Sequence, residues 1–287
     1  MRAFYAGMEI LAPAKINLSL RVLGQRADGF HEIETLMAGV GLYDRLDVRL
    51  GPPGPGRVEC DTEGVPTGPE NLVMKAAAAF FQATGIEGSA LVRLEKHIPH
   101  GAGLGGGSSD AAATLVALNA LCGTGLSVEA LERIAATFGS DTAWFVRARP
   151  AWCRGRGEVL AEAAPLPCAR VLLLKPPFGV PTPWAYRAWG EMGGPAGGTR
   201  ELGWVSLRND LEPPVFRKYL LLGALKEWLE SREGVVGALM SGSGSTVFAV
   251  LGDEAEGGDL VAAARARFGG TLFARVVGVV SEFDGRP

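Results

Sequence analysis

The sequence PHGAGLGGGSS occupies residues 99–109 and leads directly into an alanine-rich stretch whose composition predicts a helix over residues 108–121. Five of the seven residues from Gly101 to Gly107 are glycine, so side chains leave the backbone N–H groups there uncovered. The start of a helix adds unpaired N–H donors and a partial positive charge. Together with the hydroxyls of Ser108 and Ser109, the segment predicts an anion-binding loop suited to a polyphosphate.

Two common phosphate-binding loops do not fit this segment. A Walker-type loop needs a lysine after the glycines, and none follows. The run from Gly101 to Gly106 satisfies the dinucleotide pattern GxGxxG, but residues 92–98 before it alternate polar with apolar side chains, whereas a Rossmann strand is a buried apolar run. Glu129, about 20 residues further on, falls at the start of a predicted helix and not at a strand end. A flexible linker is also disfavoured, because the loop joins a strand directly to a helix.

The polar face of an early strand supplies further candidate residues. Residues 15–22 alternate strictly, which predicts a half-buried strand. Lys15 and Asn17 then point the same way, about 7 Å apart. Asp28-Gly29 predicts a turn, and residues 33–37 and 46–50 predict further strands before a loop at residues 51–56.

Helices and strands alternate irregularly along the rest of the chain. Helices are predicted over residues 71–84 with a stop at Gly85, from a cap at Ser127 to a stop at Gly139, and over residues 216–229 and 260–268. Strands are predicted at residues 171–174, 235–239, 246–251 and 272–279, and residues 190–199 are loose and glycine-rich. This mixture without strict βαβ order predicts an α+β fold. The length of 287 residues favours two domains.

Composition excludes several classes of protein. The formal net charge is −3, so the chain lacks the basic footprint of a nucleic-acid binder. No apolar run is long enough to span a membrane, and the N-terminus has no signal-peptide core. The four cysteines form no CxxC pair, which argues against a zinc site or a disulfide framework and suits a reducing cytoplasm.

The glycine-rich segment resembles the phosphate loop of the GHMP kinases, a family that includes galactokinase, homoserine kinase and mevalonate kinase. Other segments resemble, in order, the branch of that family whose acceptor is a cytidyl diphosphate sugar alcohol, 4-diphosphocytidyl-2-C-methyl-D-erythritol of the non-mevalonate isoprenoid pathway. These segments are PAKINL at residues 13–18, GQRADGFH at residues 24–31, NDLEP at residues 209–213 and MSGSGST at residues 240–246.

The resemblance implies a two-domain GHMP kinase fold with the active site in the cleft between the domains. Residues 1–155 would form the N-terminal ATP-binding domain and residues 156–287 the C-terminal domain. ATP would donate its γ-phosphoryl group to the 2-hydroxyl of the acceptor with the help of Mg²⁺. The magnesium ligands stay open, since Ser108, Ser109 and Asp110 all qualify.

Catalytic roles follow from the same resemblance. Asp141, in FGSD at residues 138–141, would be the base that takes the hydroxyl proton, and its carboxylate should project from a loop into the cleft. Lys15 would hold that base ionised and offset charge in the transition state. The family usually has Val-Pro after this aspartate, whereas Thr142-Ala143 follows here, which leaves the backbone path after Asp141 open.

Binding residues are implied in the same way. The loop residues expected to bind ATP are Pro99, His100, Gly101, Ala102, Gly103, Leu104, Gly105, Gly106, Gly107, Ser108 and Ser109. Asn71 and Lys96 match positions near the adenine pocket. The residues expected to bind the acceptor are Asn17, Phe30, His31, Thr182 and Tyr186. Phe30 and Tyr186 would stack on the cytosine, and His31 would read its edge. The loop at residues 241–246 would approach from the second domain.

Two rival functions remain. A GHMP kinase with another acceptor, such as a mevalonate or homoserine kinase, would need no site for a base, so Phe30, His31 and Tyr186 argue against it. A non-catalytic nucleotide-binding module of the same fold would not need Asp141 and Lys15.

Overall fold

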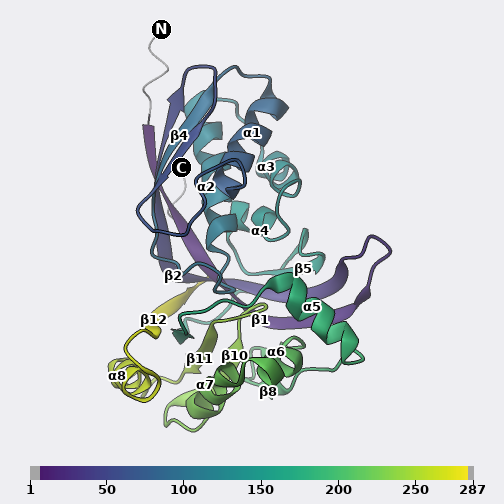
Figure 1. Ribbon diagram of the computed structural model, residues 1–287, viewed down its shortest axis with the longest axis vertical. Helices are drawn as coiled ribbons and strands as arrows, with labels where there is room; N and C mark the ends of the chain where they lie inside the picture. Colours follow the sequence, from purple (N-terminus) through teal and green to yellow (C-terminus); the bar gives the residue numbers. More distant parts are fainter. Residues whose placement is uncertain (1–6, 284–287) are drawn as a thin grey trace.

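The computed structural model describes residues 7–283, and its two halves are built on one pair of long strands (Figure 1). Strands β1 (Gly7–Gln25) and β2 (His31–Gly51) pair antiparallel from end to end. Each long strand contributes to the upper half of the molecule in Figure 1 and then runs across the waist to the hairpin tip. Helices and mostly antiparallel strands surround this pair, which confirms the α+β prediction.

The upper half places four helices against the sheet that β1 and β2 begin (Figure 1). Its other strands are β3 (Arg57–Cys60), β4 (Ser89–Glu95), β5 (Ala151–Gly155) and β6 (Val159–Glu162). Its helices are α1 (Leu72–Thr84), α2 (Gly106–Cys122), α3 (Val128–Ala135) and α4 (Thr142–Arg147). Helix α2 is buried on most sides, which explains its alanine-rich composition.

The lower half is a second antiparallel layer with its own helices. Its strands run in the order β10 (Val235–Met240), β11 (Val247–Leu251), β7 (Arg170–Lys175) and β12 (Phe273–Val280). Its helices are α5 (Thr182–Glu191), α6 (Glu212–Lys218), α7 (Leu220–Glu230) and α8 (Gly257–Phe268). Strand β12 also pairs with β2, while β9 (Ser206–Asn209), which β8 (Thr199–Glu201) flanks, pairs with β1. The two halves therefore share one continuous sheet.

Helix signals read from the sequence are confirmed at several ends. The Asn71 side chain accepts a 2.8 Å hydrogen bond from the N–H of Val73 and caps α1, and Gly85 ends that helix at φ +66°. Ser127 caps α3 in the same way.

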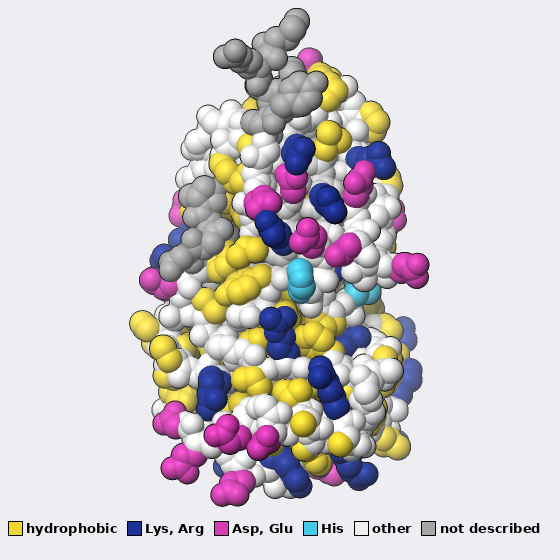
Figure 2. Space-filling view, turned by 90° about the vertical axis from the view of Figure 1, so that its left-hand side faces the viewer, with side chains coloured by type: hydrophobic (Ala, Val, Ile, Leu, Met, Phe, Trp, Pro, Cys, Tyr) yellow, Lys and Arg dark blue, Asp and Glu magenta, His cyan; other side chains and the backbone are white. Residues whose placement is uncertain are grey.

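Within residues 7–283, no helix combines the length and apolar character needed to cross a membrane. Acidic and basic side chains are both scattered over the face shown in Figure 2.

Several details of the predicted elements are wrong. The strands predicted at residues 33–37 and 46–50 are one strand, β2, because Gly39 and Gly41 interrupt the pattern without interrupting the chain. The helix predicted over residues 216–229 breaks at Tyr219 into α6 and α7. Helix α3 ends at Ala135 and not at Gly139. On the polar face of β1, Lys15, Asn17 and Ser19 are buried instead of solvated, whereas Arg21 is exposed.

Candidate active site

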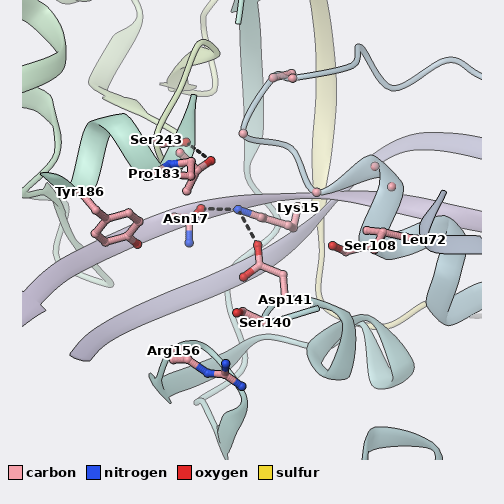
Figure 3. Close-up of a pocket in the computed structure, with 18 of the residues that line it drawn as sticks. Lys15, Asn17, Leu72, Ser108, Ser140, Asp141, Arg156, Pro183, Tyr186 and Ser243 are labelled. Carbon is pink, nitrogen blue, oxygen red and sulfur yellow. Dashed lines mark hydrogen bonds and ion pairs between the residues drawn. The ribbon is translucent and has the colours of Figure 1, made fainter. Parts of the chain in front are cut away.

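A cavity of about 1090 Å³ lies where the two halves meet, and the predicted binding segments line it. The phosphate loop and α1 line one part, and the β1–β2 hairpin and α5 line another. Figure 3 shows Lys15 and Asp141 between Ser108 on one side and Tyr186 on the other. The lining residues predicted from the sequence are Lys15, Asn17, Phe30, His31, Asn71, Lys96, Pro99, His100, Gly101, Ala102, Gly103, Gly105, Gly106, Gly107, Ser108, Asp141, Thr182 and Tyr186.

Two predicted ATP-binding residues do not line this cavity. Leu104 is buried in the hydrophobic core between the halves. Ser109 is fully buried on α2, and its hydroxyl has no hydrogen-bond partner within residues 7–283. Their predicted contact with ATP stays a prediction.

The phosphate loop is a fixed structure. Gly101, Gly103 and Gly105 all have φ between +63° and +75°, a backbone region that favours glycine. The N–H of Lys15 on β1 donates a 2.9 Å hydrogen bond to the carbonyl of Leu104. The loop is therefore anchored to β1 just before α2 begins.

The second glycine-rich loop, residues 241–246, packs against the first. The N–H of Thr246 donates to the carbonyl of Ala102 at 3.0 Å, and the Ser241 hydroxyl donates to the carbonyl of Gly103 at 2.9 Å. A Cβ atom on Gly103 would lie 2.2 Å from the carbonyl oxygen of Ser241. The loop does join the β10–β11 hairpin, as a simple turn would, but its packing also closes the phosphate loop from the lower half.

The predicted catalytic pair is assembled at the centre of the cavity. Lys15 Nζ lies 3.5 Å from Asp141 Oδ2 and donates a 2.6 Å hydrogen bond to Asn17 Oδ1. Asn17 Nδ2 in turn donates to the Thr35 hydroxyl at 2.8 Å, and Thr35 donates to the carbonyl of Ser19 at 2.6 Å. Lys15 is only 3% exposed. A buried ammonium beside an accessible carboxylate can stabilise negative charge that develops in the cavity.

Asp141 lies just before α4, at the N-cap position, yet its side chain makes no capping hydrogen bond. The carboxylate faces Lys15 instead and is about one-third exposed to the cavity (Figure 3). Thr142 and Ala143, which replace the expected Val-Pro, form the buried first turn of α4. The substitution therefore leaves the Asp141 carboxylate directed at Lys15.

Lys96 is held in a buried cluster beneath the phosphate loop. Its ammonium group contacts Asp44 Oδ2 and lies 2.8 Å from Asp110 Oδ2. Burial opposes the charge on Lys96, but the two carboxylates outweigh it and raise the lysine pKa. Burial also raises the pKa of Asp110, with Lys96 opposing the shift and Asp44 adding to it.

Asp44 is a site residue that sequence reasoning missed. Its Oδ1 accepts the N–H groups of His97 and Ile98, which ends β4 at Glu95 instead of at Ile98 as predicted. The sequence did carry a signal for it. Period-two alternation puts Asp44 on the same face as Leu42 and Leu46, where a carboxylate needs buried partners.

Aromatic side chains gather at the hairpin end of the cavity. The rings of His31 and Tyr186 stack with centroids 5.1 Å apart, so in this structure His31 lies against the second predicted stacking residue. Burial lowers the pKa of His31 and raises that of Tyr186. Phe30 is 51% exposed, and the guanidinium of Arg156 lies 4.8 Å from its ring centre. Arg156 lines the cavity and was not found from the sequence.

The cavity suits a nucleotide and a metal ion that arrives with it. Backbone N–H groups of a glycine loop at a helix start offer an anion site. Residues 7–283 hold no group of three or more His, Cys, Asp or Glu side chains that could bind a metal. Magnesium often binds through one or two protein groups plus substrate phosphates, which requires no such group. Of the three candidate ligands, Ser108 and Asp110 both line the cavity, although Asp110 is paired with Lys96, whereas Ser109 is buried.

Two family models match the chain. The GHMP kinases N terminal domain covers residues 71–148, and the GHMP kinases C terminal domain covers residues 200–270. The matches lie on either side of residues 155 and 156, where the sequence predicts the domain boundary. The boundary itself stays a prediction.

Comparison with individual proteins narrows the similarity to one branch of this family. A 4-diphosphocytidyl-2-C-methyl-D-erythritol kinase of Methylacidiphilum infernorum is 41% identical over 280 residues, which cover 95% of this chain and 96% of the relative. The crystal structure of a 4-(cytidine 5'-diphospho)-2C-methyl-D-erythritol kinase matches at TM-score 0.73 and 37% identity, covering 94% of this chain and 99% of the other. A homoserine kinase from Cytophaga hutchinsonii matches at TM-score 0.69 but only 20% identity, covering 98% and 96%, which shows a shared fold alone.

Proposed function

The chain belongs to the GHMP kinases, and within them to the 4-diphosphocytidyl-2-C-methyl-D-erythritol kinases, and we propose that it transfers the γ-phosphoryl group of ATP to the 2-hydroxyl of that acceptor. The single observation that carries the assignment of chemistry is the Lys15–Asp141 pair, 3.5 Å apart in a cavity that the phosphate loop also lines. A cavity of about 1090 Å³ has room for two substituted ligands.

Asp141 acts as the general base in this proposal. Its carboxylate accepts the proton of the acceptor hydroxyl as the oxygen attacks the γ-phosphorus and the bond to the β-phosphate oxygen breaks. Lys15 balances the negative charge that develops on the transferring group beside Asp141, while Asn17 holds the Lys15 ammonium in place. Most of the rate enhancement then comes from positioning and charge.

We assign the other residues that line the cavity either to ATP, the phosphoryl donor, or to the acceptor. The backbone of residues 99–109 binds the ATP phosphates, and Asn71 and Lys96 lie at the adenine end. The cytosine is bound by Phe30, His31 and Tyr186. Thr182 contacts the acceptor, and its hydroxyl oxygen lies 2.8 Å from the hydroxyl oxygen of Ser243, which supports it. Ser108 and Asp110 are the candidate side chains in the cavity that would hold Mg²⁺, which would supply charge neutralisation to the ATP phosphates.

Kinetics with two acceptors test the proposed function. We would measure kcat/KM with ATP for the full cytidyl diphosphate acceptor and for methylerythritol phosphate, which lacks the cytidyl group. A remote group that does no chemistry can still position the reacting end, so the truncated acceptor should lose turnover as well as affinity. Equal use of both acceptors would make the enzyme a GHMP kinase of another specificity. No turnover with any acceptor, together with ATP binding, would support the non-catalytic module.

A further inference from the structure

Four cationic side chains line the cavity, and two of them, Lys15 and Lys96, are buried and held by short hydrogen bonds or ion pairs. Lys15 is paired with Asp141 and Asn17, and Lys96 is enclosed by two carboxylates. Arg187 is 67% exposed at the rim, 3.7 Å from Glu191. The fourth is Arg156, whose guanidinium makes no hydrogen bond among the described residues and has only a 3.8 Å approach to Glu158.

The position of Arg156 matches the connectivity of the proposed acceptor. It lies in the turn between β5 and β6, where the Gly155 N–H donates a 3.0 Å hydrogen bond to Glu32 on β2. Its guanidinium is next to the Phe30 ring, at the proposed cytosine end. Figure 3 shows it on the same wall as Ser140 and Asp141, toward the reacting end. In the acceptor, the diphosphate lies between the cytidine and the reacting alcohol.

A guanidinium suits that group. It presents five N–H donors in a planar fork and binds phosphate oxygens in pairs. The contact with the Phe30 ring holds the side chain at the cavity wall before the ligand arrives, and a cation–π contact at an exposed site is weak enough to be replaced.

We propose that Arg156 is a specificity-determining residue that binds the diphosphate of the acceptor. The inference rests on the proposed function, because it takes the acceptor to be a cytidyl diphosphate. It adds a contact to the linking group, whereas Phe30, His31 and Tyr186 address the base. Without Arg156, the enzyme should lose much of its preference for a diphosphate-bearing ligand over the bare nucleoside.

The test compares cytidine with cytidine diphosphate by calorimetry. Saturating non-hydrolysable ATP analogue keeps both ligands out of the donor site. The proteins are the wild type, Arg156→Gln, Arg156→Lys and the matched control Arg187→Gln. We expect Arg156→Gln to weaken cytidine diphosphate about tenfold or more and cytidine less than about twofold. Arg156→Lys should fall between, and Arg187→Gln should match the wild type.

Each other outcome overturns the proposal in a recognisable way. If Arg156→Gln keeps the wild-type ratio of the two affinities, Arg156 does not bind the diphosphate. If it weakens both ligands equally, Arg156 acts only through the stack with Phe30. If the wild type binds neither ligand, the cytidyl site fails and the proposed function fails with it. Unchanged thermal unfolding of the variants shows that each reading concerns the site and not the fold.

Discussion

The ammonium group of Lys15 donates a 2.6 Å hydrogen bond to the side-chain oxygen of Asn17, two positions along the same strand. The oxygen can face Lys15 because the amide nitrogen of Asn17 donates to Thr35 on the neighbouring strand. Thr35 cannot reverse this arrangement, since its own hydroxyl proton goes to the carbonyl of Ser19. The orientation of Lys15 toward Asp141 thus depends on a hydroxyl that does not touch the base.

Removing the Thr35 hydroxyl should therefore impair catalysis, although Thr35 does not contact Asp141. Thr35→Val keeps the volume but leaves Asn17 Nδ2 without an acceptor, so the amide can turn its N–H groups toward Lys15. We expect kcat to fall about tenfold and stability by about 1 kcal/mol, with KM for ATP unchanged. Thr35→Ser retains the hydroxyl and should restore kcat. Wild-type kcat in Thr35→Val would mean that the hydroxyl is not needed.

Asp141→Asn tests the proposed base. The amide keeps the shape of the side chain but cannot accept the hydroxyl proton. Turnover should fall by roughly 10² to 10⁴. Calorimetric affinity for ATP should hardly change, since a carboxylate offers no donor to the phosphate oxygens. Near wild-type turnover in a steady-state assay would show that another group takes the proton.

Substitutions at two glycines of the phosphate loop distinguish an effect on stability from an effect on ATP binding. Gly103→Ala would bring a Cβ within 2.2 Å of the Ser241 carbonyl oxygen at a left-handed φ, so we expect a loss of about 1–3 kcal/mol in unfolding experiments. Gly107→Ala is helical and meets only Leu72, at 3.7 Å. That variant should fold at least as stably as the wild type, yet its methyl group should weaken ATP binding in calorimetry.

Gly105→Val would be a less suitable change for this test. A Cβ on Gly105 would lie 2.5 Å from the Phe145 ring and 3.2 Å from Lys15 Cγ. Loss of ATP binding in that variant would therefore mix a binding effect with distortion of the catalytic lysine. Unchanged ATP affinity in a folded Gly107→Ala would contradict the backbone cradle.

Phe30→Ala should weaken the acceptor selectively. Base–aromatic stacking contributes about 1–3 kcal/mol per base, so KM for the acceptor should rise roughly tenfold or more while KM for ATP stays the same. Leu23→Ala is a matched control, because Leu23 is a similarly exposed apolar residue on the same hairpin and does not line the cavity. An equal effect of both changes would point to the hairpin as a whole.

Asp110 should make stability depend on pH. Burial, aided by Asp44 and opposed by Lys96, raises the pKa of Asp110 to about 8. A raised folded-state pKa means that the folded protein binds the extra proton, so this group's stabilisation is complete below the ordinary Asp value near 3.9 and is lost as pH rises toward about 8. Asp110→Asn mimics the protonated form. Its stability relative to wild type should therefore increase from pH 5 to pH 8.5 in denaturant titrations, and parallel curves would rule this out.

Local sequence signals predicted many of the longer elements, because capping and alternation act over a few residues, but they did not reveal α4, β5, β6 or α5. Asn71, Gly85 and Ser127 mark helix ends where expected. The errors lie where distant segments decide the outcome. Strand β4 ends early because Asp44 captures the N–H groups that would have continued it. No local pattern announces that pairing.

The site residues also differ in whether the sequence alone could predict them. Lys15 and Asn17 could be placed on one face from alternation alone, and the family likeness supplied Asp141. Arg156 and Thr35 could not be found this way. An arginine in a turn and a threonine in a strand look solvated or structural until folding brings them beside Phe30 and Asn17.

The contact between the two glycine-rich loops also bears on how the protein is made. Gly103 and Ser241 are 138 positions apart, so the nucleotide loop leaves the ribosome long before the segment that fixes it has been synthesised. Strand β12, near the end of the chain, must then pair with β2 to complete the shared sheet. Such long-range closure slows folding relative to local contacts. The nascent N-terminal half carries the whole loop sequence but lacks the segment that packs on it, so we expect the loop to reach its final form only after residues 241–246 have been synthesised.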